Sequence, residues 1–144
     1  MPNASRTILI NRPITEVFAF FADAENDPRW RSGVKEIQRQ GELGAGTRYR
    51  QRIKGPGGRA ITADIEVTAY EPDSHVAFQG VAGPVRPHGS YDFRDNGTAT
   101  EVTFTLDAQI SGIKKLFMGG AVQKSMDAEV AGLDRAKSVL ESRE

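Results

Sequence analysis

The first forty residues constrain the fold of this chain more than any other part of it. The run from Ala4 to Asn11 is rich in Thr and Ile and predicts a strand. Pro13 follows, and proline suits the first turn of a helix because its missing N–H has no partner there. Apolar residues then recur at helical spacing, at Ile14, Val17, Phe18 and Phe21. The sequence therefore predicts a strand, a short helix with one apolar face, and a second short helix or turn from Asp23 to Arg31.

Most of the chain beyond these helices, up to the last thirty residues, is predicted to be strand. Six further strands are expected: Val34–Gln40, Thr47–Lys54, Arg59–Tyr70, Val76–Val81, Gly89–Arg94 and Thr98–Ala108. Glycine-rich and proline-containing turns separate them, and Asp95-Asn-Gly97 is a strong hairpin signal. The pattern favours an antiparallel meander of about seven strands.

The hairpin around Gly55–Gly58 allows a prediction of strand register. One register gives four cross-strand pairs: Ile53–Ile61, Tyr49–Ile65, Arg50–Asp64 and Arg48–Glu66. Apolar residues then oppose apolar residues and opposite charges meet, which stabilises antiparallel pairs. We therefore interpret the alternating arginines 48, 50 and 52 as a solvated ion-pair face and not as an anion site.

The last thirty residues predict a closing helix from Ile113 to Ser142. One side of it is apolar: Ile113, Phe117, Val122, Met126, Val130, Leu133 and Leu140. Gly119-Gly120 is expected to bend or break its first turns. The segment Ile113–Met118 mixes lysines with large apolar residues and has two readings. It is either a mobile portal that touches a membrane during ligand exchange, or an ordinary helix start that packs on the core.

Composition narrows the function classes. Lys and Arg together number 19, as do Asp and Glu, so the net charge is zero and no basic footprint for nucleic acid is evident. The chain has no cysteine and only two histidines, His75 and His88, which argues against a metal site, and no cofactor is expected. No signal peptide or membrane-length apolar run is recognised, so we expect a cytoplasmic protein without stable membrane insertion. The length suits a single domain, residues 1–144.

Several local features accompany this order of elements: Ile10–Phe21 with Pro13 and Val17, Pro28-Arg29-Trp30, Gly44–Tyr49, Tyr70-Glu-Pro72, Gly97-Thr98 and the closing amphipathic helix. Through them the chain resembles the START-like helix-grip superfamily (SRPBCC), and within it the polyketide cyclase/dehydrase and lipid-transport group that includes Bet v 1-like proteins. The resemblance covers nearly the whole chain. It implies an α+β helix-grip fold, in which a curved antiparallel sheet of about seven strands wraps around a long C-terminal helix. Two short helices lie between the first and second strands.

The resemblance also implies an apolar cavity between sheet and helix that holds a lipid, a polyketide or another small hydrophobic molecule. Large side chains are expected to face it, and they are the candidate ligand-binding residues: Trp30, Tyr49, Gln51, Phe78, His88, Tyr91, Phe93, Phe104, Phe117, Val122 and Met126. Each of them also has a plain reading as core packing, because aromatic residues in this number are able to fill the cavity. A homodimer is compatible with the sequence, but no residue requires it.

Catalytic residues are not evident from the sequence. His88 begins a strand near the expected cavity mouth, whereas His75 lies in a turn. We interpret Asp23 and Asp27 as caps that flank a helix break, and find no supported acid–base pair. The favoured function is binding or transfer of a hydrophobic or amphipathic molecule. Two alternatives are a cyclase or dehydratase that uses Tyr49, Gln51, His88 or Tyr91, and a protein-interaction module with a filled cavity.

Overall fold

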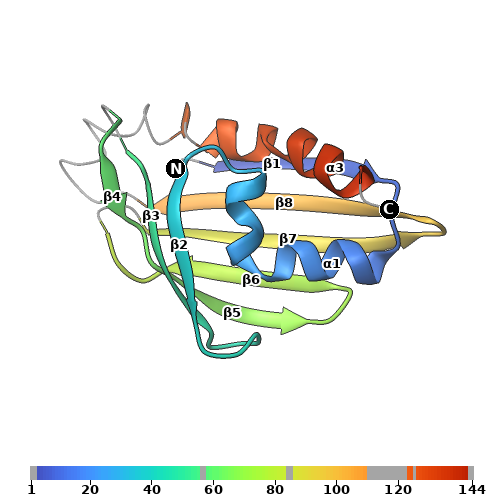
Figure 1. Ribbon diagram of the computed structural model, residues 1–144, viewed down its shortest axis with the longest axis horizontal. Coiled ribbons are helices and arrows are strands. Elements are labelled where there is room, and N and C mark those ends of the chain that lie inside the picture. Colours follow the sequence, from blue (N-terminus) through green and yellow to red (C-terminus); the bar gives the residue numbers. More distant parts are fainter. Residues whose placement is uncertain (1–2, 56–57, 84–85, 110–122, 125, 143–144) are drawn as a thin grey trace.

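One curved antiparallel sheet forms the body of the computed structural model (Figure 1). The structure describes residues 3–55, 58–83, 86–109, 123–124 and 126–142. Seven strands follow each other across the sheet in the order β1-β8-β7-β6-β5-β3-β2, and β4 pairs with β3 beside this path. The strands are β1 (Asn3–Ile10), β2 (Val34–Gln40), β3 (Arg48–Lys54), β4 (Ala60–Thr62), β5 (Ile65–Glu71), β6 (His75–Gly80), β7 (Arg86–Asn96) and β8 (Ala99–Gln109).

The helices lie against one face of this sheet (Figure 1). Helix α1 (Ile14–Ala22) begins directly after Pro13, and the 3-10 helix η1 (Ala24–Arg29) follows it. Residues 126–131 are helical, and α3 (Leu133–Glu141) continues after Gly132. The backbone N–H of Gly132 donates to the carbonyl of Ala128 at 3.1 Å, and its carbonyl accepts from Ala136 at 3.2 Å, so residues 126–141 act as one C-terminal helix.

The core lies between the concave face of the sheet and these helices. Strand β8 shows how the sequence pattern produces it, because alternate side chains of a strand point to the same face. The predicted inward set on this strand is buried: Val102, Phe104, Leu106 and Ala108. Val17, Phe18 and Phe21 of α1 are buried against it, as the helical spacing predicted. The helix-grip fold expected from the sequence is therefore confirmed.

The segment from Arg59 to Tyr70 differs from the single strand that the sequence predicted. It forms two strands, β4 and β5, separated at Ala63 and Asp64. Three predicted pairs are present, Ile53–Ile61, Tyr49–Ile65 and Arg48–Glu66. The fourth is not, because Asp64 has left the ladder and its carboxylate accepts a hydrogen bond from the backbone N–H of Gln51 at 3.0 Å. The interruption matters for function, since it leaves the carbonyl of Ala63 free to hold a side chain of the site.

Strand β7 is longer than predicted and begins at Arg86 instead of Gly89. Pro87 pairs with Ala108 of β8, beyond the last β6–β7 pair, Gln79–His88, so its missing N–H breaks no ladder on the β6 side. Several predictions fall outside the described residues. They concern the start of the closing helix, the Gly119-Gly120 break, the Ile113–Met118 segment, and the side chains of Phe117 and Val122.

Candidate functional site

A cavity of about 540 Å³ lies between the concave face of the sheet and the C-terminal helix. Its wall is built by α1, η1, strands β3 to β8 and, from the C-terminal segment, Lys124, Met126, Ala128 and Glu129. This volume is in the range of pockets that hold small organic molecules.

One end of the cavity is closed by aromatic side chains. Phe21, Phe78, Tyr91 and Phe104 form its wall. Tyr91 and Phe104 stack with ring centroids 4.5 Å apart, and Phe21 lies 5.1 Å from Tyr91. Behind this wall, Trp30 packs edge-on against Phe21 and Phe104 and is 1% exposed. The aromatic contacts fix the shape of this end of the cavity.

The position of Phe78 in this wall depends on a glycine of the neighbouring strand. Gly89 pairs with Phe78 between β6 and β7, and a Cβ at position 89 would lie 2.2 Å from Phe78 Cζ. The ring of Phe78 therefore covers the backbone of Gly89, an approach that only glycine permits. Any side chain at position 89 would push Phe78 into the cavity or away from it.

The other end of the cavity has smaller walls and reaches solvent. Ala63, Ile65 and Ala108 line it from strands β5 and β8 and the chain just before β5, and Val67 lines the cavity beside its cross-strand partner Phe78. Four further lining residues are exposed, which places the opening between the β3–β4 hairpin and the C-terminal helix: Lys54, Thr62, Lys124 and Ala128. The described part of the opening therefore carries two cations.

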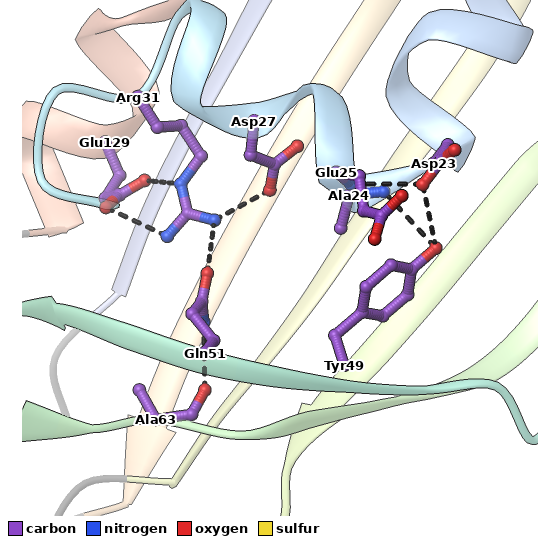
Figure 2. Close-up of polar contacts among 9 residues, drawn as sticks. All are labelled: Asp23, Ala24, Glu25, Asp27, Arg31, Tyr49, Gln51, Ala63 and Glu129. Atoms are coloured by element: carbon purple, nitrogen blue, oxygen red, sulfur yellow. Dashed lines mark hydrogen bonds and ion pairs between the residues drawn. The ribbon is translucent and has the colours of Figure 1, made fainter. Parts of the chain in front are cut away.

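A buried polar cluster interrupts the apolar wall (Figure 2). We call it the Arg31 cluster, and its members are Asp27, Arg31, Gln51 and Glu129. Nε and Nη2 of Arg31 donate to the two carboxylate oxygens of Glu129 at 2.5 and 3.1 Å. Nη1 donates to Asp27 Oδ2 at 2.7 Å and to Gln51 Oε1 at 3.0 Å. The Arg31 side chain is 12% exposed, so these charge-assisted bonds form in a largely dry environment.

Local structure explains why these four side chains meet. Asp27 and Arg31 lie one turn apart at the end of η1, where the backbone N–H of Arg31 donates to the Asp27 carbonyl at 2.7 Å. Gln51 is an inward residue of β3, and its amide donates to the free carbonyl of Ala63 at 2.9 Å. Glu129 stands three residues after Met126 and four before Leu133, on the buried face of its helix.

The charges of the cluster are strongly coupled. Burial raises the pKa of Asp27 from 3.8 to about 6, although Arg31 acts to lower it. Burial also acts to lower the pKa of Arg31, but Glu129 and Asp27 outweigh it and hold this pKa above its usual value. Arg31 therefore stays charged, and Asp27 titrates just below neutral pH. Asp27 Oδ1 is buried and has no hydrogen-bond partner in the described part of the chain.

Two tyrosines complete the polar features of the cavity wall. Tyr49 OH accepts from the backbone N–H of Ala24 at 3.3 Å and lies 3.4 Å from Asp23 Oδ1 (Figure 2). Burial raises the pKa values of both Tyr49 and Tyr91 well above the usual tyrosine range. Both phenols therefore remain protonated at neutral pH.

The residues predicted from the sequence fall into four groups. Tyr49, Gln51, Phe78, Tyr91, Phe104 and Met126 line the cavity. Trp30 and Phe93 lie behind the wall, where they pack on Phe21 and Tyr91. His88 does not reach the cavity, because it alternates with inward residues of β7; its side chain is 61% exposed and lies 3.7 Å from Asp107. Phe117 and Val122 are outside the described residues.

Sequence reasoning missed three members of the Arg31 cluster. Asp23 caps η1 as expected, accepting from the N–H of Glu25 at 3.1 Å, but the interpretation of Asp27 as a cap is wrong. Its side chain is turned inward to Arg31. The available signals were the four-residue spacing of Asp27 and Arg31, and the position of Glu129 within an apolar helical stripe.

Comparison with known proteins identifies the family. The sequence model of the family described as "Polyketide cyclase / dehydrase and lipid transport" matches residues 1–141. The chain belongs to this family. Membership supports either the binding of a small hydrophobic ligand or polyketide cyclase chemistry in the cavity. No curated protein matches the chain.

Solved structures of the same fold include proteins from several bacteria. The protein TTHA0849 from Thermus thermophilus is 20% identical, with a TM-score of 0.77 over 99% of this chain and 100% of that one. A START superfamily protein from Mycobacterium smegmatis is 14% identical, with a TM-score of 0.78 over 96% and 97%. Zhui aromatase/cyclase from Streptomyces sp. R1128 is 17% identical, with a TM-score of 0.76 over 98% and 94%. At these identities the likeness establishes the fold.

The helices of the described residues include none that is long and apolar enough to cross a membrane. The predicted cytoplasmic location and the homodimer stay predictions.

Proposed function

We propose that this family member binds a small, largely apolar molecule in its cavity and holds one polar group of that molecule at the Arg31 cluster. The observation that carries this proposal is the cavity of about 540 Å³, with aromatic and aliphatic walls and one buried polar cluster. Apolar walls supply affinity, and a few placed polar groups supply orientation. Such a combination is typical of sites for amphipathic small molecules.

The packing of the closed end supports a preformed site. Trp30 and Phe93 brace the wall residues Phe21 and Tyr91 from behind, so the wall does not collapse into the empty volume. A binding site that is already shaped loses little conformational entropy when the ligand enters. The open cavity supports ligand binding over the interaction-module alternative, which assumed a filled cavity.

Binding of the neutral, apolar dye N-phenyl-1-naphthylamine tests the proposal. We expect saturable fluorescence enhancement with the wild-type protein. Val67→Trp places a large ring in the cavity and is expected to weaken binding by about tenfold or more, since the open volume is lost. Thr68→Trp is the matched control, because Thr68 is exposed and is the next residue of the same strand. Equal binding by the two variants, or no saturable binding by the wild type, contradicts the proposal.

A second candidate function is cyclisation or dehydration of a polyketide-like substrate in the same cavity. The observation that favours it is Asp27, a buried carboxyl in the cavity wall whose pKa of about 6 suits proton transfer near neutral pH. Arg31 acts to lower the pKa of Asp27, and the negative charge of Asp27 adds to burial in raising the pKa of Tyr91. In this role Asp27 moves the proton, and Tyr49, Tyr91 or Gln51 orients the substrate oxygen.

Turnover of a short poly-β-ketone separates the two candidates. If the protein is a cyclase, product formation measured by mass spectrometry falls by about a hundredfold in Asp27→Asn, in line with the loss of a general acid–base group. Dye binding should survive in that variant. Absence of any wild-type product over the uncatalysed rate leaves binding as the function that the site supports.

A further inference from the structure

The charge balance of the Arg31 cluster limits which polar group the cavity accepts. The cluster holds one guanidinium and two carboxylates, those of Asp27 and Glu129. Its net charge is therefore negative when both carboxylates are ionised. An arginine in a cavity wall usually suggests an anion site. Here the positive charge of Arg31 is outweighed by the two negative charges of Asp27 and Glu129.

The hydrogen bonds of Arg31 lead to the same conclusion. Arg31 donates through Nε, twice through Nη1 and once through Nη2 to protein oxygens. A guanidinium has five N–H groups, so about one is left for a ligand. A carboxylate bound in the usual two-bond manner has no matching pair of donors here.

The acceptor side of the cluster is the one that lacks a partner. Asp27 is 3% exposed, lines the cavity, and its Oδ1 accepts no hydrogen bond in the described residues. A buried acceptor without a partner costs stability, and a donor that reaches it recovers that cost. The ligand group that best fits beside Asp27 is thus a neutral group with an O–H or N–H donor.

We propose that the Arg31 cluster makes the cavity selective for neutral ligands that carry a hydroxyl or similar donor, such as phenols, and that Asp27 disfavours carboxylates of the same size. This inference rests on the proposed ligand-binding function and names the ligand class for it. The specificity-determining residue is Asp27, through its negative charge and its unpaired oxygen.

Other charged groups must be considered because the selectivity depends on charge. Asp27 is faced by Arg31, by Glu129 of the C-terminal helix, by Asp23 before η1 and by the Tyr91 phenol of β7. Lys54 and Lys124 lie at the open end of the cavity and attract anions there. The wild-type protein and its Asp27 variant both carry these two lysines. A difference between the two proteins in ligand selectivity therefore comes from the Arg31 cluster.

Displacement of N-phenyl-1-naphthylamine by 2-naphthol and by 2-naphthoate tests the inference. The readout is the ratio of the two dissociation constants. In Asp27→Asn we expect the affinity for 2-naphthoate relative to 2-naphthol to rise by about tenfold. The cluster loses one negative charge, and because the amide oxygen stays on Arg31, an NH2 donor takes the place of the free acceptor. Asp134→Asn is the matched control: it also removes one carboxylate, but Asp134 is 68% exposed and pairs with Arg6 outside the cavity. It should leave the ratio unchanged.

Lowering the pH gives a second, independent readout. As the pH falls from about 7.5 to about 5.5, Asp27 takes up a proton. The affinity of the wild type for 2-naphthoate relative to 2-naphthol should then rise, since 2-naphthoate remains mostly ionised in this range. Asp27→Asn should not show this change. A ratio that is the same in wild type and Asp27→Asn, or failure of 2-naphthol to displace the bound dye, overturns the inference. Lack of dye binding itself would instead refute the proposed function.

Discussion

The two ends of the concave face differ in how completely side chains fill them. At the end under α1, Phe18, Trp30 and Phe93 are buried in an aromatic core behind the cavity wall. We call the buried residues that do not line the cavity the packed region. Where Ala63, Ile65, Val67 and Ala108 face the cavity, the same sheet leaves about 540 Å³ empty; we call this the open region. Sheet curvature alone therefore does not make a cavity, and side-chain size decides where one remains.

The largest expected difference between the regions is in the free energy of unfolding lost when an isoleucine in each is truncated to alanine. Ile10→Ala in the packed region should lower the free energy of unfolding by about 3–4 kcal/mol, since Ile10 is 0% exposed and does not border the cavity. Ile65→Ala in the open region should cost about 1–2 kcal/mol, because part of the Ile65 surface already faces empty space. Urea denaturation measures both values. Equal losses would mean that the two regions are equally well packed.

The pKa of Asp27 reports how completely water is excluded from the boundary between the two regions. Its pKa is raised from 3.8 to about 6, so the folded state holds its proton more tightly than the unfolded state. The resulting stabilisation is present below pH 3.8 and is lost as the pH rises through about 6. A shift of about two units corresponds to roughly 3 kcal/mol.

Asp27→Asn cannot titrate, so its stability relative to the wild type should rise by up to this amount of roughly 3 kcal/mol between about pH 4 and pH 7. Urea midpoints at a series of pH values measure it, and Asp134→Asn serves as the exposed control. A flat difference across this range would show that water reaches Asp27 and that burial does not control its pKa.

The smallest effect comes from adding one methylene group to each region. Val102→Ile in the packed region should destabilise the protein by about 1 kcal/mol, because Val102 is 0% exposed and has no free volume beside it. Val67→Ile points into the cavity and should change stability by less than about 0.5 kcal/mol. Thermal melts followed by circular dichroism are sensitive enough to separate the pair. Similar losses at both positions would place Val67 in a filled environment.

The sequence identified most of the scaffold because the signals for it are local. Alternation along β3 and β8 and helical spacing along α1 predicted which residues turn inward, and the cross-strand partners of Tyr49 and Ile53 followed from matching charge and polarity. The same patterns predicted that Tyr49, Gln51 and Phe104 would face the helix. They failed at Ala63 and Asp64, where a side-chain-to-backbone bond replaced the strand ladder.

Local patterns in the sequence are sufficient to predict the order of the elements, the apolar face of each, and hence the family and the helix-grip fold. Two features emerge only in three dimensions: the cavity stays open, and a buried polar cluster forms in its wall from Asp27, Arg31, Gln51 and Glu129. The periodicity of apolar residues tells which side chains of a single helix or strand point inward, because it depends only on neighbours within that element. Empty volume and a buried ion network depend on distances between elements that are as many as 98 residues apart in the chain, as Arg31 and Glu129 are.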